Sequence, residues 1–343
     1  MGFKTDSHPR NGICAADARF GYSLYNSPVS TTISSAMIFK YWLAAARIRT
    51  LPLAAATVLA GCLSARLQGS GSVAVTALCV LTAVLLQIFA NLANDYGDAA
   101  NGADRHRNGA PPRMVGSGRI APSAMKHALR ATALLCCLSG ISLLAVALPA
   151  VGAAGWRSWL LWLLLGAAAV AAAFCYTAGR KPYGYAGFGD LAVFVFFGLI
   201  AVAGSEFLHT GRLNPLTFLP ASAMGLWCCM VLNLNNMRDI DGDAAAGKNT
   251  VAVRLGLRGA KVYHTLAAVG AALCWWLWLD NAALFSDGPA APLSRIFLAA
   301  ATLAHLYALK TATSSAALDR LLPRWSITVL LWTGLLWAAH LAL

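Results

Sequence analysis

The chain has 343 residues, of which 59% are hydrophobic and only 11% are charged. A soluble globular protein carries about 25% charged residues, so this composition excludes an ordinary soluble protein and indicates a helical membrane protein. The net charge of +13 is spread over short segments between apolar runs. This distribution is typical of loops that set membrane topology and argues against a nucleic-acid partner.

Residues 1–36 precede the first apolar run. They are rich in Ser, Asn, Gly and Asp, show no helical or alternating period, and lack the apolar core of a signal peptide. We predict a disordered cytoplasmic tail over residues 1–36, followed by one nine-helix membrane domain over residues 37–343.

Nine apolar runs follow, each close to or above the roughly 18 residues that cross a bilayer. The sequence therefore predicts an all-α, polytopic membrane bundle, and we expect Pro52 to kink its first helix. In chain order the predicted helices cover about 38–67, 72–98, 127–151, 156–177, 188–209, 216–236, 260–279, 293–311 and 325–343.

The basic residues predict the orientation of this bundle. With the N-terminus in the cytoplasm, all but four of the 26 Lys and Arg residues fall in cytoplasmic segments. The exceptions are Arg66, Arg157, Arg212 and Arg295. The positive-inside rule then predicts an integral protein of the cytoplasmic (inner) membrane, with the second and sixth helices both ending on the cytoplasmic face.

Two acidic patches close the second and sixth predicted helices. The members of each patch are three or four residues apart, so they share one helix face. The first patch holds Asn91, Asn94, Asp95 and Asp98, and the second holds Asn235, Asp239 and Asp243. We expect the two patches to meet at the cytoplasmic face.

Oxygen-rich patches of this kind suit Mg²⁺, an ion that proteins commonly share with substrate phosphates. No Cys or His stands at ligand spacing to them, which disfavours zinc. The C-terminus of a helix carries partial negative charge, which favours a cation and disfavours a bare phosphate. A diphosphate that is bound through a metal ion avoids this conflict. Basic residues in the loops could bind the diphosphate oxygens. Their alternative role is to set the membrane topology only. They are Arg113, Arg119, Lys248 and Arg254.

A diphosphate site beside an apolar bundle implies a substrate with a lipid tail. Metal ions and cations would stabilise diphosphate as a leaving group. The chemistry indicated is ionisation of an allylic diphosphate, followed by capture of the carbocation by an electron-rich acceptor.

The two patches, Asn91-x-x-x-Asp95-x-x-Asp98 and Asn235-x-x-x-Asp239-x-x-x-Asp243, resemble the aspartate motifs of the UbiA-type intramembrane prenyltransferases. Longer strings are similar to the branch of that family that acts on 1,4-dihydroxy-2-naphthoate in menaquinone biosynthesis. They are RIRTLP at 47–52, NLANDYGDAANGAD at 91–104, YTAGRKPYGYAGFGD at 176–190 and NLNNMRDIDGDAAAGKNTVAVRLG at 233–256. The resemblance covers residues 40–340.

The resemblance implies a central cavity open to the cytoplasmic side, Mg²⁺, a polyprenyl diphosphate donor and a 1,4-dihydroxy-2-naphthoate acceptor that loses CO2. The product would be demethylmenaquinone. The implied metal ligands are Asn91, Asp95, Asp98, Asp239 and Asp243. The implied diphosphate ligands are Asn91, Asn235, Arg113, Arg119, Lys181, Lys248 and Arg254.

The implied catalytic residues are the four aspartates and one aromatic residue, namely Asp95, Asp98, Asp239, Asp243 and Tyr176. The Tyr176 ring would face the carbocation, with bulk packing as its alternative role. Lys181, Tyr183 and Asp190 match a third stretch of the family without a defined role. The segment from Arg107 to Arg113 is longer than in the family, which leaves Arg107 as a rival to Arg113.

Other functions remain open at this point. The same chemistry could serve another aromatic acceptor, such as 4-hydroxybenzoate or homogentisate. An ion-coupled transporter is a remote alternative, because its acids would be expected near mid-bilayer on broken helices rather than at helix ends.

Overall fold

The computed structural model describes residue 2 and residues 35–106, 112–179, 181–282 and 290–342. The chain divides into two units, residues 1–38 and 39–343. Nearly all of the predicted tail lies outside the described residues, so its disorder stays a prediction.

The described residues are helical, with no β-strand among them. The elements are α1 (Ser35–Ala46), η1 (Ile48–Thr50), α2 (Leu51–Leu67), α3 (Val73–Ala100), η2 (Ala103–His106), α4 (Pro122–Ala150), α5 (Trp156–Cys175), α6 (Gly189–Val193), η3 (Phe194–Ala203), α7 (Gly204–Thr210), η4 (Pro215–Thr217), α8 (Phe218–Arg238), α9 (Ile240–Ala245), α10 (Val251–Asn281), α12 (Ala290–Thr311) and α13 (Ser315–Leu341).

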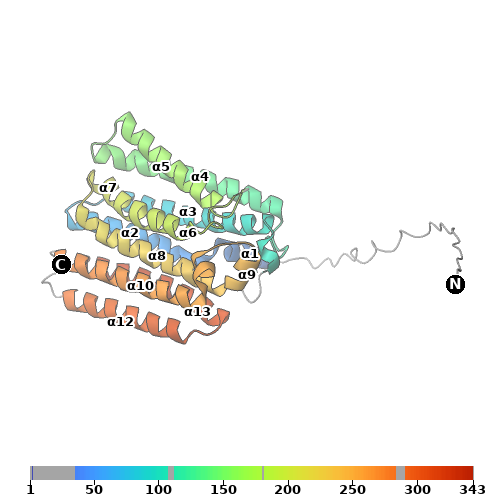
Figure 1. The fold of residues 1–343 in the computed structure, drawn as a ribbon. Helices are drawn as coiled ribbons and strands as arrows, with labels where there is room; N and C mark the ends of the chain where they lie inside the picture. The colour runs from blue at the N-terminus through green and yellow to red at the C-terminus, as the bar shows by residue number, and fades with distance from the viewer. Residues whose placement is uncertain (1, 3–34, 107–111, 180, 283–289, 343) are drawn as a thin grey trace. The chain divides into compact units, whose positions relative to one another are not determined.

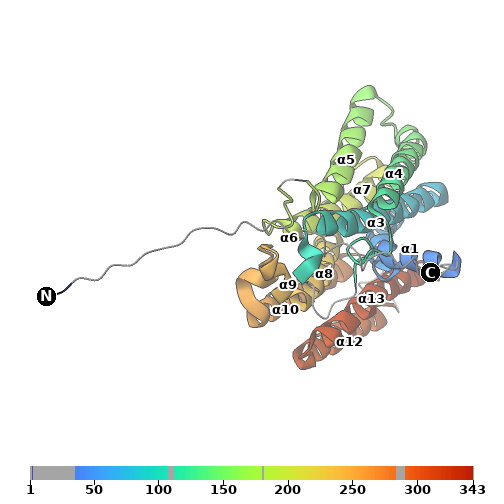
Figure 2. The same cartoon turned by 90° about the vertical axis from the view of Figure 1, so that its right-hand side faces the viewer.

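Across these ranges, nine helical segments are long and apolar enough to cross a membrane. They are α1–α2, α3, α4, α5, α6–η3–α7, η4–α8, α10, α12 and α13. The all-α fold with nine membrane helices, predicted from hydropathy, is thereby confirmed, and the chain is an integral membrane protein. Within residues 39–343 the long helices run side by side (Figures 1 and 2).

The first span is interrupted earlier than the sequence predicted. The break lies at Arg47, whose backbone is left-handed with φ 50° and ψ 57°, and not at Pro52. Pro52 instead stands in the first turn of α2, where its missing N–H costs no hydrogen bond. Proline therefore begins a new helix here instead of bending an existing one.

Three other helices begin well before their predicted starts, and the third of them, α13, begins at Ser315 instead of about residue 325. The α4 helix begins at Pro122, because proline again suits a first turn. The α10 helix begins at Val251, where the Thr250 hydroxyl accepts a hydrogen bond from the Val253 N–H at 3.2 Å and caps the helix. This helix is then bent at Gly256, which has φ 66°.

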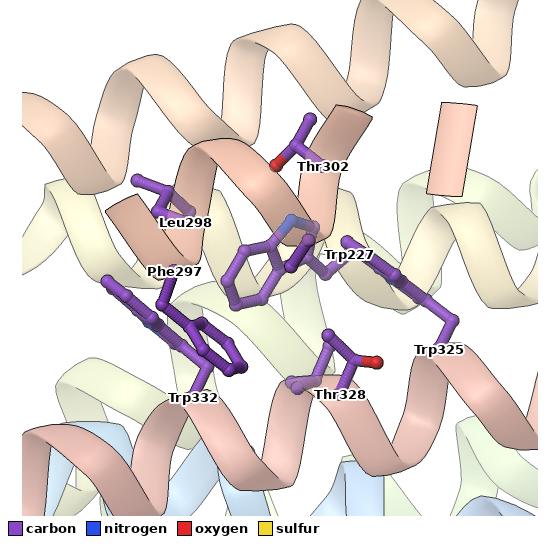
Figure 3. Close-up of a pocket in the computed structure, with 9 residues that line it drawn as sticks. Trp227, Phe297, Leu298, Thr302, Trp325, Thr328 and Trp332 are labelled. Atoms are coloured by element: carbon purple, nitrogen blue, oxygen red, sulfur yellow. The ribbon is translucent and has the colours of Figure 1, made fainter. Parts of the chain in front are cut away.

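The core of the bundle is built around α8, which contacts α10, η3, α13 and α2. Indole rings fill the space between these helices. Trp227 of α8 lies 5.7 Å from Trp275 and 5.6 Å from Trp325, measured between ring centres. Trp227, Trp325 and Trp332 line a void of about 10 Å³, and Figure 3 shows how these side chains lie. A void of that size holds at most one water molecule, so this part of the core is packed and offers no substrate cavity.

Several helix ends are tied together at one end of the bundle. The Asn101 side chain, just after α3, donates to the Thr177 carbonyl after α5 at 2.7 Å. The Asn249 N–H, just before α10, donates to the Tyr185 carbonyl at 2.8 Å. These bonds gather the polar loops after α3, α5 and α9, and they bring both predicted acidic patches to that end.

Candidate functional site

Asp98, in the last turn of α3, is the centre of a polar cluster at this end of the bundle. The cluster consists of Asp98, Arg113, Tyr185, Asp243 and Lys248. The Asp98 side chain is fully buried and its carboxylate accepts three hydrogen bonds. Oδ2 accepts from Arg113 Nη2 at 2.5 Å. Oδ1 accepts from Lys248 Nζ and from the Tyr185 hydroxyl, each at 2.9 Å. Because the donors follow three different helices, Asp98 holds three loops together.

Lys248 joins the two acidic patches. Its Nζ lies 2.9 Å from Asp98 of the first patch and 3.4 Å from Asp243 of the second. It also lies 4.7 Å from the centre of the Tyr185 ring, a cation–π distance. The Lys248 N–H donates to the Asp243 carbonyl at 2.8 Å, so the turn after α9 sets the spacing. Carboxylates far apart in the sequence thus share one ammonium.

The neighbouring acids and bases act on one another electrostatically. Burial raises the pKa of Asp243, Lys248 lowers it, and the negative charges of Asp239 and Asp98 raise it again. Burial lowers the pKa of Arg113 to about 10, against the attraction of Asp239 and Asp243. Arg113 therefore stays charged at neutral pH and lies among carboxylates of both patches.

The Arg113 guanidinium has donors to spare. Its Nη2 binds Asp98, but Nε and Nη1 are buried and have no hydrogen-bonding partner within the described part of the chain. Buried donors are rarely left unpaired in folded proteins. A phosphate oxygen would satisfy such a planar pair of donors, so the cluster fits an anionic ligand.

Asp239 begins a second polar chain. Arg238 binds its carboxylate with two hydrogen bonds, Nε to Oδ1 at 2.7 Å and Nη2 to Oδ2 at 2.8 Å. Arg238 Nη1 also donates to Asp319 Oδ1 at 2.5 Å, and Asp319 Oδ2 accepts from Arg49 at 2.9 Å. Asp239 is thus linked through Arg238 to α13 and to η1.

Asp95, predicted as a metal ligand, is buried and accepts two backbone hydrogen bonds. Oδ2 accepts from the Met114 N–H at 2.9 Å, and Oδ1 from the Val115 N–H at 2.8 Å. The carboxylate therefore holds the turn that starts at Arg113. Its role as a metal ligand stays a prediction.

The two asparagines of the motifs bind backbone and hydroxyl groups. Asn91 Nδ2 donates to the Ala46 carbonyl at 2.9 Å and to Thr50 Oγ1 at 3.1 Å, which holds the break in the first span. Asn235 Nδ2 donates to the Val231 carbonyl of its own helix at 3.2 Å. Contacts of either residue with a diphosphate stay predictions.

Three of the predicted basic ligands lie farther out. Arg119 is exposed, with its guanidinium 5.5 Å from the ring centre of Tyr41. Arg254 is also exposed and donates to the Ala186 carbonyl at 2.6 Å. Lys181 is exposed in the loop after α5. Arg107, the rival of Arg113, lies outside the described residues.

Tyr176 stands at the end of α5 against the polar cluster. Its ring makes an edge contact with Tyr183, with centres 5.5 Å apart. A Cβ at Gly184 would lie 2.9 Å from the Tyr176 ring, so glycine is needed for this contact. Burial raises the pKa of Tyr176, and the charges of Asp190, Asp98 and Asp243 raise it further. The phenol therefore stays protonated at neutral pH.

An apolar groove of about 280 Å³ begins beside Tyr183. It runs between the end of α5 and the start of the α6–η3 span. The lining residues are Ala172, Tyr183, Phe188, Leu191, Ala192, Val195 and Phe196. Because Tyr183 also contacts Tyr176, this groove lies close to the polar cluster.

Within the described ranges, no three His, Cys, Asp or Glu side chains are grouped as a metal site. The ammonium of Lys248 lies between Asp98 and Asp243 instead. The donor chemistry still fits a hard divalent cation, because the available ligands are carboxylate oxygens and no thiol or imidazole is among them.

Sequence reasoning missed Tyr185, Arg49, Arg238 and Asp319 as parts of this site. Tyr185 lies in the stretch that matched the family, yet its role depends on a hydrogen bond to Asp98. Asp319 carried no such signal, because it fell in the loop before the last predicted helix, and only the structure places it in α13 beside a partner. The identity of that partner could not be read from spacing.

The chain is similar to known proteins over most of its length. The UbiA prenyltransferase family model matches residues 54–327. The chain is 45% identical over 233 residues to 1,4-dihydroxy-2-naphthoate octaprenyltransferase of Escherichia coli (strain K12), covering 68% of this chain and 74% of that protein. It is 40% identical over 257 residues to the enzyme of the same name from Mycobacterium tuberculosis (strain ATCC 25618 / H37Rv), covering 75% of this chain and 84% of that protein.

A solved structure shares the fold. It is a UbiA homologue from Archaeoglobus fulgidus bound to DMAPP and Mg²⁺, with a TM-score of 0.55 and 15% identity over 88% of this chain and 99% of that one. The family model spans most of the chain, and the two relatives exceed 30% identity. The resemblance seen in the sequence motifs is therefore confirmed, and this chain belongs to the UbiA prenyltransferase family.

Proposed function

We propose that this protein transfers a polyprenyl group from polyprenyl diphosphate to 1,4-dihydroxy-2-naphthoate, with loss of diphosphate and CO2, in menaquinone biosynthesis. The two relatives at 45% and 40% identity carry that activity in their names, which supports the proposal. The observation that carries it is the convergence of Asp98 and Asp243 on Lys248 at one end of a membrane bundle.

The diphosphate of the donor binds at this cluster. Arg113 offers its two unused donors, Nε and Nη1, and Lys248 supplies a buried positive charge between the acidic patches. Such charge-assisted hydrogen bonds are stronger than neutral ones. The exposed bases, Arg119, Lys181 and Arg254, and the amides of Asn91 and Asn235 are the further diphosphate ligands that the sequence predicts.

Mg²⁺ is the metal we propose for the site, held by Asp98, Asp239 and Asp243. A bound magnesium ion supplies Lewis-acid stabilisation of the diphosphate leaving group. Asp95 and Asn91 are also predicted ligands, and each would have to exchange its present hydrogen bonds to reach a metal. The Mg²⁺ and DMAPP bound to the Archaeoglobus fulgidus homologue support this choice of metal and ligand class.

Tyr176 and the apolar groove serve the prenyl chain. The Tyr176 ring presents a π-face that attracts a carbocation forming next to the diphosphate. The groove beside Tyr183 receives the first part of the apolar tail, which continues into the bilayer. We place this end of the bundle at the cytoplasmic face of the inner membrane, on the distribution of basic residues.

A competition assay tests the activity. Membranes that contain the full chain are given polyprenyl diphosphate, Mg²⁺ and an equimolar mixture of 1,4-dihydroxy-2-naphthoate and 4-hydroxybenzoate, with homogentisate in a separate arm. We expect prenylated naphthoquinol and CO2, and no product after chelation of divalent metal. Prenylation of 4-hydroxybenzoate or homogentisate in preference would contradict the proposed acceptor.

A further inference from the structure

Asp190 opens the α6–η3–α7 span and carries a carboxylate that the mechanism above does not use. Its Oδ1 accepts a hydrogen bond from the Tyr263 hydroxyl of α10 at 2.8 Å. The Cys229 thiol of α8 donates to its backbone carbonyl at 3.2 Å. The Tyr263 hydroxyl occupies one of the roughly four lone-pair sites of this carboxylate, so it can accept further hydrogen bonds. A carboxylate in a membrane span is costly and usually marks a ligand site.

The carboxylate lies next to the proposed reaction centre. Gly189 packs so closely on Tyr176 that a Cβ there would lie 3.0 Å from the phenol oxygen. The Tyr176 phenol also lies within electrostatic range of Asp190, Asp98 and Asp243. Asp190 and two acids of the proposed diphosphate site therefore both lie near Tyr176.

An aromatic acceptor must come within bonding distance of a carbocation held near Tyr176. A phenolic hydroxyl on that acceptor is a strong hydrogen-bond donor, and the Asp190 carboxylate, one residue after the Gly189 contact with Tyr176, can accept more bonds than the one from Tyr263. We propose that Asp190 binds a ring hydroxyl of the aromatic acceptor through Oδ2, while Tyr263 holds Oδ1 in place. This inference rests on the proposed function and adds the residue that recognises the acceptor.

The step balances without an added reagent. The C–O bond of the prenyl diphosphate breaks, and its electron pair leaves with diphosphate. A π pair of the ring forms the new C–C bond at the carbon that bears the carboxylate. The bond from that carbon to the carboxylate then breaks, its pair restores the aromatic ring, and CO2 leaves. The hydroxyl proton is shared with Asp190 during attack, which raises the electron density of the ring, and it returns afterwards.

A structural role for Asp190 makes a different prediction. If its carboxylate only ties α6 to α10, then removing either partner of the Asp190–Tyr263 bond should have the same effect. Asp190→Asn keeps the shape and an oxygen for Tyr263 but removes the charge, whereas Tyr263→Phe removes the bond and keeps the charge. Asp280→Asn is the matched control, because it neutralises an exposed carboxylate that is paired with Arg295 near the C-terminal end of α10.

The full-length variants are assayed in membranes for KM of each substrate and for kcat. We expect Asp190→Asn to raise KM for dihydroxynaphthoate about ten- to a hundredfold, the range for losing a hydrogen bond to a charged group. In the same variant, KM for polyprenyl diphosphate should change less than about twofold. Tyr263→Phe should have a smaller effect on the acceptor, and Asp280→Asn none.

A second readout needs no turnover. In purified wild-type protein without donor, the absorption band of bound dihydroxynaphthoate should move to longer wavelength, and Asp190→Asn should abolish the shift. An unchanged acceptor KM in Asp190→Asn, equal effects in Asp190→Asn and Tyr263→Phe, or no shift in the wild type would overturn the proposal. Failure of the wild type to use dihydroxynaphthoate refutes the proposed function instead, and the same comparison is then made with the phenolic acceptor that it does use.

Discussion

Arg238 binds the carboxylate of the next residue, Asp239, with two hydrogen bonds of 2.7 and 2.8 Å. The same guanidinium reaches Asp319 of α13 at 2.5 Å, and the Arg238 side chain is only 3% exposed. A buried arginine shared between two carboxylates fixes the position of both. The last helix of the bundle thereby determines where an acid of the second motif lies.

Neutralising Asp319 should misplace Asp239. In Asp319→Asn, Arg238 and Arg49 lose their shared carboxylate, so positive charge is left uncompensated near the site. We expect kcat to fall about tenfold, which corresponds to about 1.4 kcal/mol, and the melting temperature in detergent to drop. Asp280→Asn removes a more exposed ion pair and should leave kcat unchanged. A normal kcat in Asp319→Asn would show that Asp239 is positioned without this chain of contacts.

Removing the ammonium of Lys248 should weaken donor binding. In Lys248→Met, Asp98 and Asp243 face each other without the shared cation, so their mutual repulsion and the loss of a phosphate ligand act together. We expect kcat/KM for polyprenyl diphosphate to fall at least about a hundredfold, the scale of a lost buried charge interaction. Lys310→Met, at an exposed position, serves as the control. Equal kcat/KM in the two variants would refute a role of Lys248 in the donor site.

The role of Asp95 can be decided by hydrogen exchange. In this structure its carboxylate protects the N–H groups of Met114 and Val115. Asp95→Asn can accept only one of these bonds through its amide oxygen, so at least one of the two amides should exchange faster, and activity should fall. If Asp95 also becomes a metal ligand, adding Mg²⁺ and inorganic pyrophosphate to the wild type should speed exchange at the same two amides. Unchanged or slower exchange on addition would assign Asp95 to the turn alone.

Gly97 permits the close approach of α3 to the loop after α5. A Cβ at this position would lie 2.7 Å from the Thr177 carbonyl oxygen, so Gly97→Ala forces the two segments apart. We expect a loss of about 1–3 kcal/mol in stability, the usual cost of overpacking, measured by thermal denaturation in detergent. Gly140→Ala in α4 has nothing within 4 Å of the added carbon and should be neutral or slightly stabilising. Equal melting temperatures for the two variants would contradict the packing argument.

The bundle itself could be predicted from the sequence. Spans follow from runs of apolar residues, because backbone groups in lipid must be satisfied within each helix. The same pattern put Asp98 and Asp243 at the ends of helices on one face of the membrane, and the motifs identified the family. Helix breaks were less predictable, since Pro52 serves as a helix start and the break depends on the left-handed Arg47.

What the sequence by itself determined is the membrane class, the number of spans and the two acidic patches, all of which depend on short-range periodicity. Only the tertiary structure decided how each carboxylate is used. Asp98 meets Lys248 and Tyr185, Asp95 meets backbone amides, and Asp239 is tied through Arg238 to Asp319. These partners come from separate helices, and a buried charge accepts whichever donors the packing places within about 3 Å. Spacing along the chain carries no record of that choice.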